Sequence, residues 1–170
     1  MIRTLNWEIY GIVIILVEQQ GTMMEEYAYI EILIEDQSGA VLVKQIMDKY
    51  VQEKETVVYR IHSFKGIGKI PAKTNSMSQI KTKRLLTDLP MYLRGMSLSL
   101  QNIQGKKAIF VILDSDDEDC VKLKEDLLRM YQGLKITLPV FFCIAIEEIE
   151  AWLLGDSQAL LTAYPMAKRQ

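Results

Sequence analysis

Carboxylate side chains follow the apolar runs of this sequence, and carboxylates at such positions could support metal-dependent chemistry. One apolar run ends in Asp114 and Asp116, an earlier run ends in Glu35, and a later run is followed by Glu148. Carboxylate oxygens hold hard divalent cations such as Mg²⁺ or Mn²⁺, and these ions keep positions for water and a substrate phosphate. We therefore expect a divalent metal site built from these four side chains.

The same carboxylates allow other roles. Glu35 could act as a general acid or base instead of a metal ligand. Acidic residues that follow a strand also commonly begin helices, where they cap free N–H groups and favour the helix dipole. This structural role fits the acidic run 117–119, and it competes with metal binding for Asp114 and Asp116.

Four apolar runs of strand length alternate with segments of helical periodicity. Strands are predicted at Tyr27–Glu35, Thr56–His62, Ala108–Leu113 and Leu138–Ala145. Helices are predicted over 40–50, over Ser78–Leu100 with a break at Pro90 or Gly95, over Asp117–Tyr131 with Gly133 at its end, and from Glu147 onward. This alternation predicts an α/β fold, with a parallel sheet of about four strands and helices on both faces.

The predicted sheet brings the carboxylates to one place. The carboxyl ends of parallel strands share one edge, and ligands of such sheets bind there. Glu35, Asp114, Asp116 and Glu148 should converge at this edge, where a cation would offset their mutual repulsion. His62 ends a strand at the same edge and could contact a phosphate or carry a proton, although a structural role is commoner for a single histidine.

A basic, glycine-containing loop follows the second predicted strand. Lys65, Lys69 and Lys73 lie in or next to it, together with Gly66 and Gly68. The glycines do not have the spacing of a nucleotide-binding motif. The lysines could bind the phosphates of a nucleic-acid backbone independently of its sequence. Alternatively, they could lie on a solvated surface loop that binds no ligand.

The composition fits one globular domain. The chain has 170 residues, of which 49% are hydrophobic and 25% are charged, and its net charge is −2. Because this charge excludes a global basic field, any contact with nucleic acid must come from a local patch. Cys120 and Cys143 show no metal-binding spacing, so we expect a reducing, cytoplasmic location.

Separate expectations apply to the two ends of the chain. Residues 1–24 are predicted to form an extension, either an extra strand or a dispensable segment, and residues 25–170 a single domain. The apolar run Ile9–Val17 is shorter than the about 20 residues that cross a bilayer, and Glu18 follows it where a signal peptide would need small residues. We therefore expect no membrane segment. The last residues end without a further periodic element, so the domain could be truncated there.

Longer strings of this sequence resemble a known family. Glu35 closing an apolar strand, followed by a glycine-bearing turn, and an Asp-x-Asp closing a later strand resemble the TOPRIM domain of topoisomerases, primases and nucleases. The strings at 113–124 and 145–156, the latter with Glu-x-Glu-Ala-Trp-Leu-Leu-x-Asp, are similar to the TOPRIM-like bacterial family catalogued as domain of unknown function 4276. The resemblance covers the chain from Glu26 to its C-terminus.

The resemblance implies a TOPRIM-like, Rossmann-like fold and assigns roles to particular residues. Glu35 takes the position of the TOPRIM glutamate, and Asp114 and Asp116 take those of its metal-binding aspartates. Glu148 and Glu150 fall on the family's paired glutamates, and of these two we favour Glu148 as the residue that faces the site. The family further implies Mg²⁺-dependent cleavage or transfer at phosphodiesters, and an ATPase partner in antiviral defence. Where the family reads Val-Glu-Gly followed by Thr-Glu, this chain has Ile-Glu-Asp-Gln-Ser-Gly at 34–39, so one carboxylate of the turn is missing.

Three functions are consistent with these residues. The first, which we favour, is a Mg²⁺- or Mn²⁺-dependent nuclease that acts on DNA or RNA together with an ATPase partner. The second is a catalytically weak regulatory or nucleic-acid recognition subunit of the same fold. The third is a receiver-like phosphoacceptor that uses Asp114, but no suitable lysine ends the next strand. Each function is compatible with an oligomer.

Overall fold

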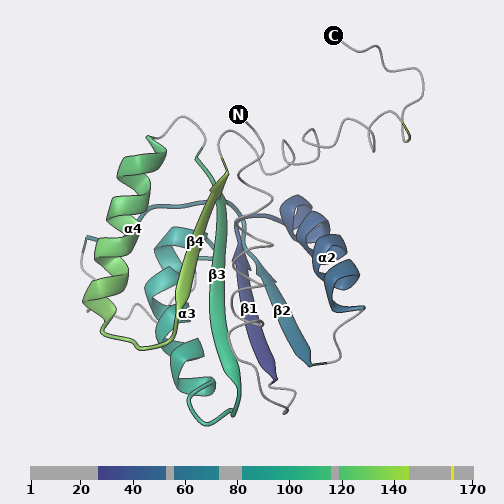
Figure 1. Cartoon of the computed structure of the whole chain (residues 1–170). Helices are drawn as coiled ribbons and strands as arrows, with labels where there is room; N and C mark the ends of the chain where they lie inside the picture. Colours follow the sequence, from purple (N-terminus) through teal and green to yellow (C-terminus); the bar gives the residue numbers. More distant parts are fainter. Residues whose placement is uncertain (1–26, 53–55, 73–81, 116–118, 146–161, 163–170) are drawn as a thin grey trace.

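Strands and helices alternate along the part of the chain that the structure describes. The computed structural model describes residues 27–52, 56–72, 82–115, 119–145 and 162. The elements are β1 (Ala28–Ile34), α2 (Gln37–Val51), β2 (Val57–Ser63), α3 (Leu85–Ser99), β3 (Lys106–Asp114), α4 (Cys120–Leu134) and β4 (Val140–Ala145). The strands form one parallel sheet in the order β2-β1-β3-β4 (Figure 1). The prediction of an α/β fold with a four-stranded parallel sheet is confirmed.

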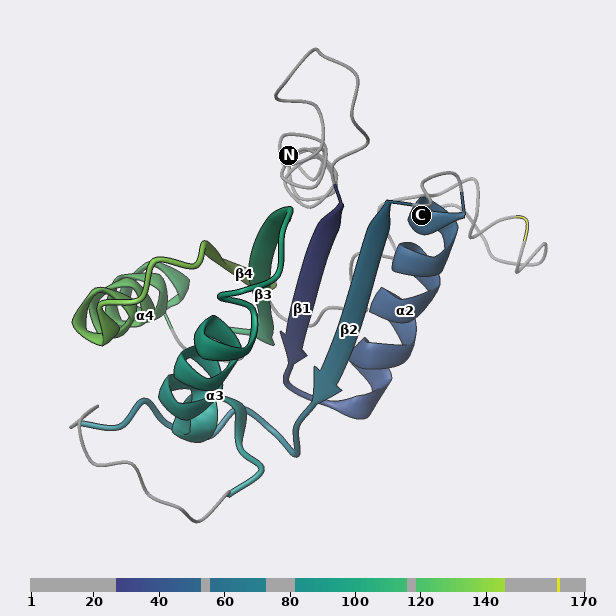
Figure 2. The ribbon, with the colours of Figure 1, turned by 90° about the horizontal axis from the view of Figure 1, so that it is seen from below.

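Helices cover both faces of the sheet because the two central strands are apolar on both sides. On β1, Ile32 packs with the cluster under α2, whereas Leu33 packs with the cluster under α3 and α4. On β3, Phe110 and Val111 divide between the two clusters in the same way. Figure 2 shows α2 on one side of the strands and α3 and α4 on the other. This double burial explains why the run 108–113 of β3 is continuously apolar, and why β1 is apolar apart from Tyr29 and Glu31, rather than alternating.

The strand order reverses at the centre of the sheet. From β1 the chain passes through α2 to β2 on one side, and from β3 it passes through α4 to β4 on the other. The carboxyl ends of β1 and β3 therefore flank a topological switch point, with Ile34 paired to Ile112 just before it. Ligands of open α/β sheets bind in the crevice at such a point.

The helix predicted from Ser78 begins later, and neither predicted break occurs. Residues 73–81 lie outside the described residues, residues 82–84 are not helical, and α3 starts at Leu85. Pro90 and Gly95 both lie inside α3. Pro90 cannot donate a backbone hydrogen bond, but the helix continues because Leu89 and Leu93 are fully buried on the sheet. In α3, the burial of these leucines against the sheet outweighs the low helix propensity of Pro90 and Gly95.

The helix predicted over 117–131 is shifted toward the C-terminus. Asp119 is its N-cap and accepts hydrogen bonds from the backbone N–H groups of Val121 and Lys122, so α4 runs over Cys120–Leu134. Residues 117 and 118 lie outside the described residues. Gly133 is still helical, and Lys135 takes the left-handed conformation that ends the helix. The helical spacing of the apolar residues in this segment predicts that Val121 and Leu128 lie on its buried side with Leu123, Leu127 and Met130. Val121 and Leu128 are 63% and 41% exposed, so for these two residues the prediction is wrong.

None of the described helices has the length and apolarity that crossing a membrane requires. The predicted extension over residues 1–24 and the predicted helix from Glu147 lie outside the described residues.

Candidate active site

Glu35 and Asp114 meet at the switch point of the sheet. The backbone N–H of Asp114 donates a hydrogen bond to Oε2 of Glu35, with a nitrogen–oxygen distance of 3.3 Å. The two residues are 79 positions apart in the sequence, and both are half-buried. The structure therefore brings together two of the carboxylate residues that the sequence assigned to one site.

Both neighbours of β1 hold the backbone of Glu35. Its N–H donates to the carbonyl of Ile112 on β3 (3.3 Å), and its carbonyl accepts from the N–H of Gly66 beyond β2 (3.1 Å). These bonds continue the sheet one residue past β1. They fix the direction in which the Glu35 side chain leaves the strand, toward the end of β3.

The backbone after Asp114 is held by β4, the neighbour of β3 on the side away from β1. Ser115 is buried, with 3% of its surface exposed, and its N–H donates to the carbonyl of Ala145 at the end of β4 (2.9 Å). The carboxyl ends of β1, β3 and β4 are thereby held next to one another. Asp116 and Glu148, the remaining predicted ligands, lie outside the described residues.

In the turn after Glu35, the carboxylate of Asp36 begins a helix. Oδ1 of Asp36 accepts a hydrogen bond from the N–H of Gly39 (2.7 Å), and Oδ2 accepts one from the hydroxyl of Ser38 (2.9 Å). Asp36 is thus the N-cap of α2. This is the position at which the sequence departs from the pattern of the family that it resembles, and the substituted residue has a structural task.

The chemistry of Glu35 and Asp114 fits a hard divalent ion. No group of three or more His, Cys, Asp or Glu residues that could hold a metal occurs among the residues with described positions. Mg²⁺, however, is usually bound through one or two carboxylates, with water and substrate oxygens completing its shell. A carboxylate has about four lone-pair sites, so accepting one N–H does not prevent Glu35 from binding a metal.

The basic loop lies next to Glu35. Gly66 contacts the Glu35 backbone as described above, and Lys65 donates its N–H to the carbonyl of Lys83 at 2.7 Å. The side chains of Lys65 and Lys69 are exposed, whereas Lys73 lies outside the described residues. The backbone of the loop is therefore anchored beside the candidate site, while two of its three predicted phosphate-binding side chains face solvent.

Close packing, rather than a ligand, accounts for the glycines of this loop. Gly66 and Gly68 have φ angles of 98° and 73°, which favour glycine. A Cβ at Gly68 would lie 2.6 Å from Oγ1 of Thr87 and 2.7 Å from Cβ of Arg84. The loop can approach α3 this closely only because these side chains are absent.

Asp88 positions the start of α3, and it is not among the functional residues predicted from the sequence. Its carboxylate is 5% exposed and accepts hydrogen bonds from the N–H and hydroxyl of Thr82 and from the N–H of Lys83, at 2.8–3.1 Å. Because Lys83 in turn binds the loop backbone at Lys65, Asp88 supports the loop beside Glu35. An acidic residue in the first turn of a helix was the one signal available for it.

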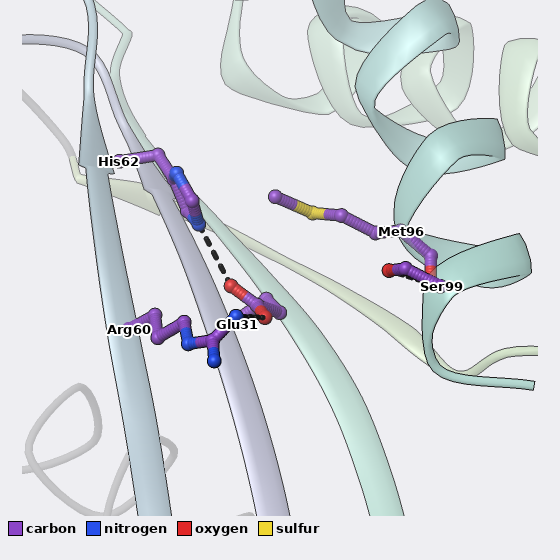
Figure 3. A network of polar contacts seen from close by, with 5 residues as sticks. All are labelled: Glu31, Arg60, His62, Met96 and Ser99. Carbon is purple, nitrogen blue, oxygen red and sulfur yellow. Dashed lines mark hydrogen bonds and ion pairs between the residues drawn. The ribbon is translucent and has the colours of Figure 1, made fainter. Parts of the chain in front are cut away.

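A second polar network lies on β1 and β2. Glu31, only 7% exposed, contacts Nε2 of His62 through Oε2 at 2.7 Å, and its Oε1 lies 3.9 Å from Arg60. Figure 3 shows both partners reaching Glu31 from β2, while Met96 of α3 points toward the pair. A buried carboxylate thus engages the His62 ring, as a structural histidine requires. The sequence signal for it was a charged residue within an apolar strand.

Comparisons with known proteins give no relative. A scan of protein-family models, a search of curated proteins and a search of solved structures each found no match to this chain. The resemblance to the TOPRIM-like family is therefore carried by the motifs of the sequence alone.

Proposed function

We propose that this protein is a Mg²⁺- or Mn²⁺-dependent phosphodiester-processing enzyme of the TOPRIM-like type, a nuclease that works with an ATPase partner in defence against foreign nucleic acid. The observation that carries the proposal is the hydrogen bond from the Asp114 N–H to Oε2 of Glu35 at the switch point. It supports the proposal because the two residues come from separate strands and meet where α/β sheets bind ligands.

In this proposal, Glu35 and Asp114 hold the metal ion, and Asp116 and Glu148 complete its ligands. When bound, such an ion polarises a phosphoryl oxygen, activates an attacking water and stabilises the leaving oxygen. Glu35 retains the alternative role of general acid or base toward that water.

The basic loop would bind the substrate backbone. Lys65 and Lys69 carry exposed charges on a loop that is hydrogen-bonded to Glu35 through Gly66, and Lys73 follows in sequence. Phosphate contacts of this kind position a nucleic acid without reading its sequence, and they weaken as salt increases.

The turn at Asp36 favours a second candidate, a catalytically weak regulatory or nucleic-acid recognition subunit. The carboxylate of Asp36 caps α2 and binds Ser38 and Gly39. The carboxylate that follows Glu35 in this turn therefore serves the start of α2. A subunit of this kind would bind nucleic acid and the ATPase partner without cutting phosphodiesters.

Nicking of supercoiled DNA and of labelled RNA by the full chain, with and without Mn²⁺, separates the two candidates. We expect metal-dependent nicking that falls by roughly 100-fold or more in Glu35→Gln and Asp114→Asn, because metal ligands contribute at least as much as their outer partners. Glu125→Gln, an exposed carboxylate on α4, is the matched control and should retain activity. Unchanged nicking in both site variants would refute the catalytic assignment. Salt-sensitive binding without any nicking would favour the recognition subunit.

A further inference from the structure

The hydroxyl of Ser115 is a buried polar group without a hydrogen-bond partner in the part of the chain that the structure describes. Ser115 directly follows Asp114, and only 3% of its surface is exposed. Its backbone N–H donates to the carbonyl of Ala145, but its Oγ makes no hydrogen bond with a described residue. The other two buried polar side chains of the described residues, Glu31 and Asp88, both have hydrogen-bond partners.

A buried hydroxyl without a partner is unfavourable, because it loses the hydrogen bonds that it makes to water in the unfolded chain. Most buried polar groups of proteins are paired for this reason, and one that is not points to a bound ion or water. The hydroxyl of Ser115 offers two lone pairs and one proton. Since so little of the residue is exposed, its partner must be small. A metal ion or a water meets this condition.

Ser115 and Glu35 lie on the same face of the sheet. Leu33 of β1 and Leu113 of β3 both pack into the apolar cluster under α3 and α4. Side chains two residues apart in a strand share a face, and backbone hydrogen bonds continue the sheet to Glu35 and to Ser115. The alternation therefore places both side chains on the α3 side of adjacent strands. The Glu35 carboxylate also accepts from the N–H of Asp114, the residue directly before Ser115.

We propose that the hydroxyl oxygen of Ser115 is a ligand of the divalent ion that Glu35 holds. This inference rests on the proposed function, because it takes the metal site at the ends of β1 and β3 as given. Mg²⁺ and Mn²⁺ accept neutral oxygen ligands beside carboxylates, and a serine or threonine hydroxyl binds Mg²⁺ in phosphate-binding loops. The position beside a carboxylate favours a cation over an uncharged water. A bound water would instead leave the metal affinity independent of residue 115.

Binding of Mn²⁺ to the full chain and to Ser115→Ala, followed by electron paramagnetic resonance of the free ion, tests the proposal. We expect the affinity to fall by about tenfold or more in Ser115→Ala, because a ligand contributes at least as much as its outer partners. Ser63→Ala is the matched control. Ser63 is an exposed serine at the end of β2, hydrogen-bonded to Gln37, and its replacement should leave the Mn²⁺ affinity unchanged.

Urea unfolding without metal separates a metal ligand from a structural residue. Because the Ser115 hydroxyl has no partner among the described side chains and backbone groups, its removal should leave the urea midpoint unchanged or raise it. A clearly lower midpoint for Ser115→Ala than for the wild type would assign the hydroxyl to folding and overturn the inference.

Ser115→Cys offers a thiol in place of the hydroxyl and should shift the metal preference toward the soft ion Cd²⁺. We expect the ratio of Cd²⁺ to Mn²⁺ affinity to rise by at least about tenfold. The ultraviolet charge-transfer band from thiolate to Cd²⁺ should exceed that of Ser63→Cys and of the wild type, which has Cys120 and Cys143. An unchanged ratio would overturn the inference.

The result for Glu35→Gln separates this inference from the proposed function. Wild-type Mn²⁺ affinity in Ser115→Ala, together with reduced affinity in Glu35→Gln, would overturn the role of Ser115 and leave the proposed metal site standing. Absence of Mn²⁺ binding by the wild type would overturn both.

Discussion

Replacing His62 with alanine should destabilise the protein by about 2 kcal/mol, because it leaves Glu31 buried without its close partner. A hydrogen bond to a charged group contributes roughly 1.5–3 kcal/mol. The 2.7 Å contact to Glu31 is of this kind, and the 36% exposure of the His62 side chain lets water replace part of it. Arg60, at 3.9 Å and 74% exposed, compensates little.

Urea unfolding measures this cost. With a slope of about 2 kcal/mol per molar urea, the midpoint of His62→Ala should fall by about 1 M. Arg60→Ala is the matched control on the same strand and should cost less than about 0.5 kcal/mol. Adding Glu31→Leu to His62→Ala removes the unpaired buried carboxylate and should restore most of the loss. Wild-type stability of His62→Ala, or a double variant no more stable than His62→Ala, would contradict this role of the His62–Glu31 contact.

Two further predictions concern Asp88 beside the site and the contact between Tyr59 of β2 and Asp48 of α2. Asp88→Ala removes the acceptor of three hydrogen bonds and should lower the free energy of unfolding, measured in urea, by about 2–3 kcal/mol. The control Asp126→Ala breaks an exposed ion pair with Arg129 and should lower it by less than about 0.5 kcal/mol. Equal losses in the two variants would contradict the role of Asp88. Burial and a hydrogen bond to Asp48 raise the pKa of Tyr59 from 10.0 to about 12, so its stabilisation should be complete below pH 10 and lost as the pH rises to about 12. Absorbance titration of the wild type against Tyr59→Phe checks this shift, and a Tyr59 phenol that ionises near pH 10 would contradict it.

The sheet could be predicted because its strands are marked by composition. Buried parallel strands read as continuous apolar runs, and the run that includes Phe110 is buried on both faces. The carboxyl ends of such strands necessarily share an edge, so the proximity of Glu35 and Asp114 followed from the fold class. The strand order did not follow, since hydrophobic periodicity does not specify which strands are neighbours.

Helix boundaries and supporting residues were harder to predict because they depend on contacts distant in sequence. The start of α3 is set by Asp88 together with the basic loop, and the end of α4 by a left-handed residue at Lys135, for which Gly133 was the more obvious local signal. Glu31 lies buried in an otherwise apolar strand, and its carboxylate contacts His62 on the neighbouring strand. The sequence marks Asp88 as an acidic residue in a first helical turn and Glu31 as a charged residue in an apolar strand, but no local pattern identifies the partners of either residue.

Binding of Mn²⁺ to the full chain, followed by electron paramagnetic resonance of the free ion, tests the central claim that Glu35 and Asp114 share a metal site. We predict saturable binding by the wild type and by Glu125→Gln, with affinity reduced by about 10- to 100-fold or more in Glu35→Gln and in Asp114→Asn. Wild-type affinity in both site variants, or no binding by the wild type, would contradict the claim.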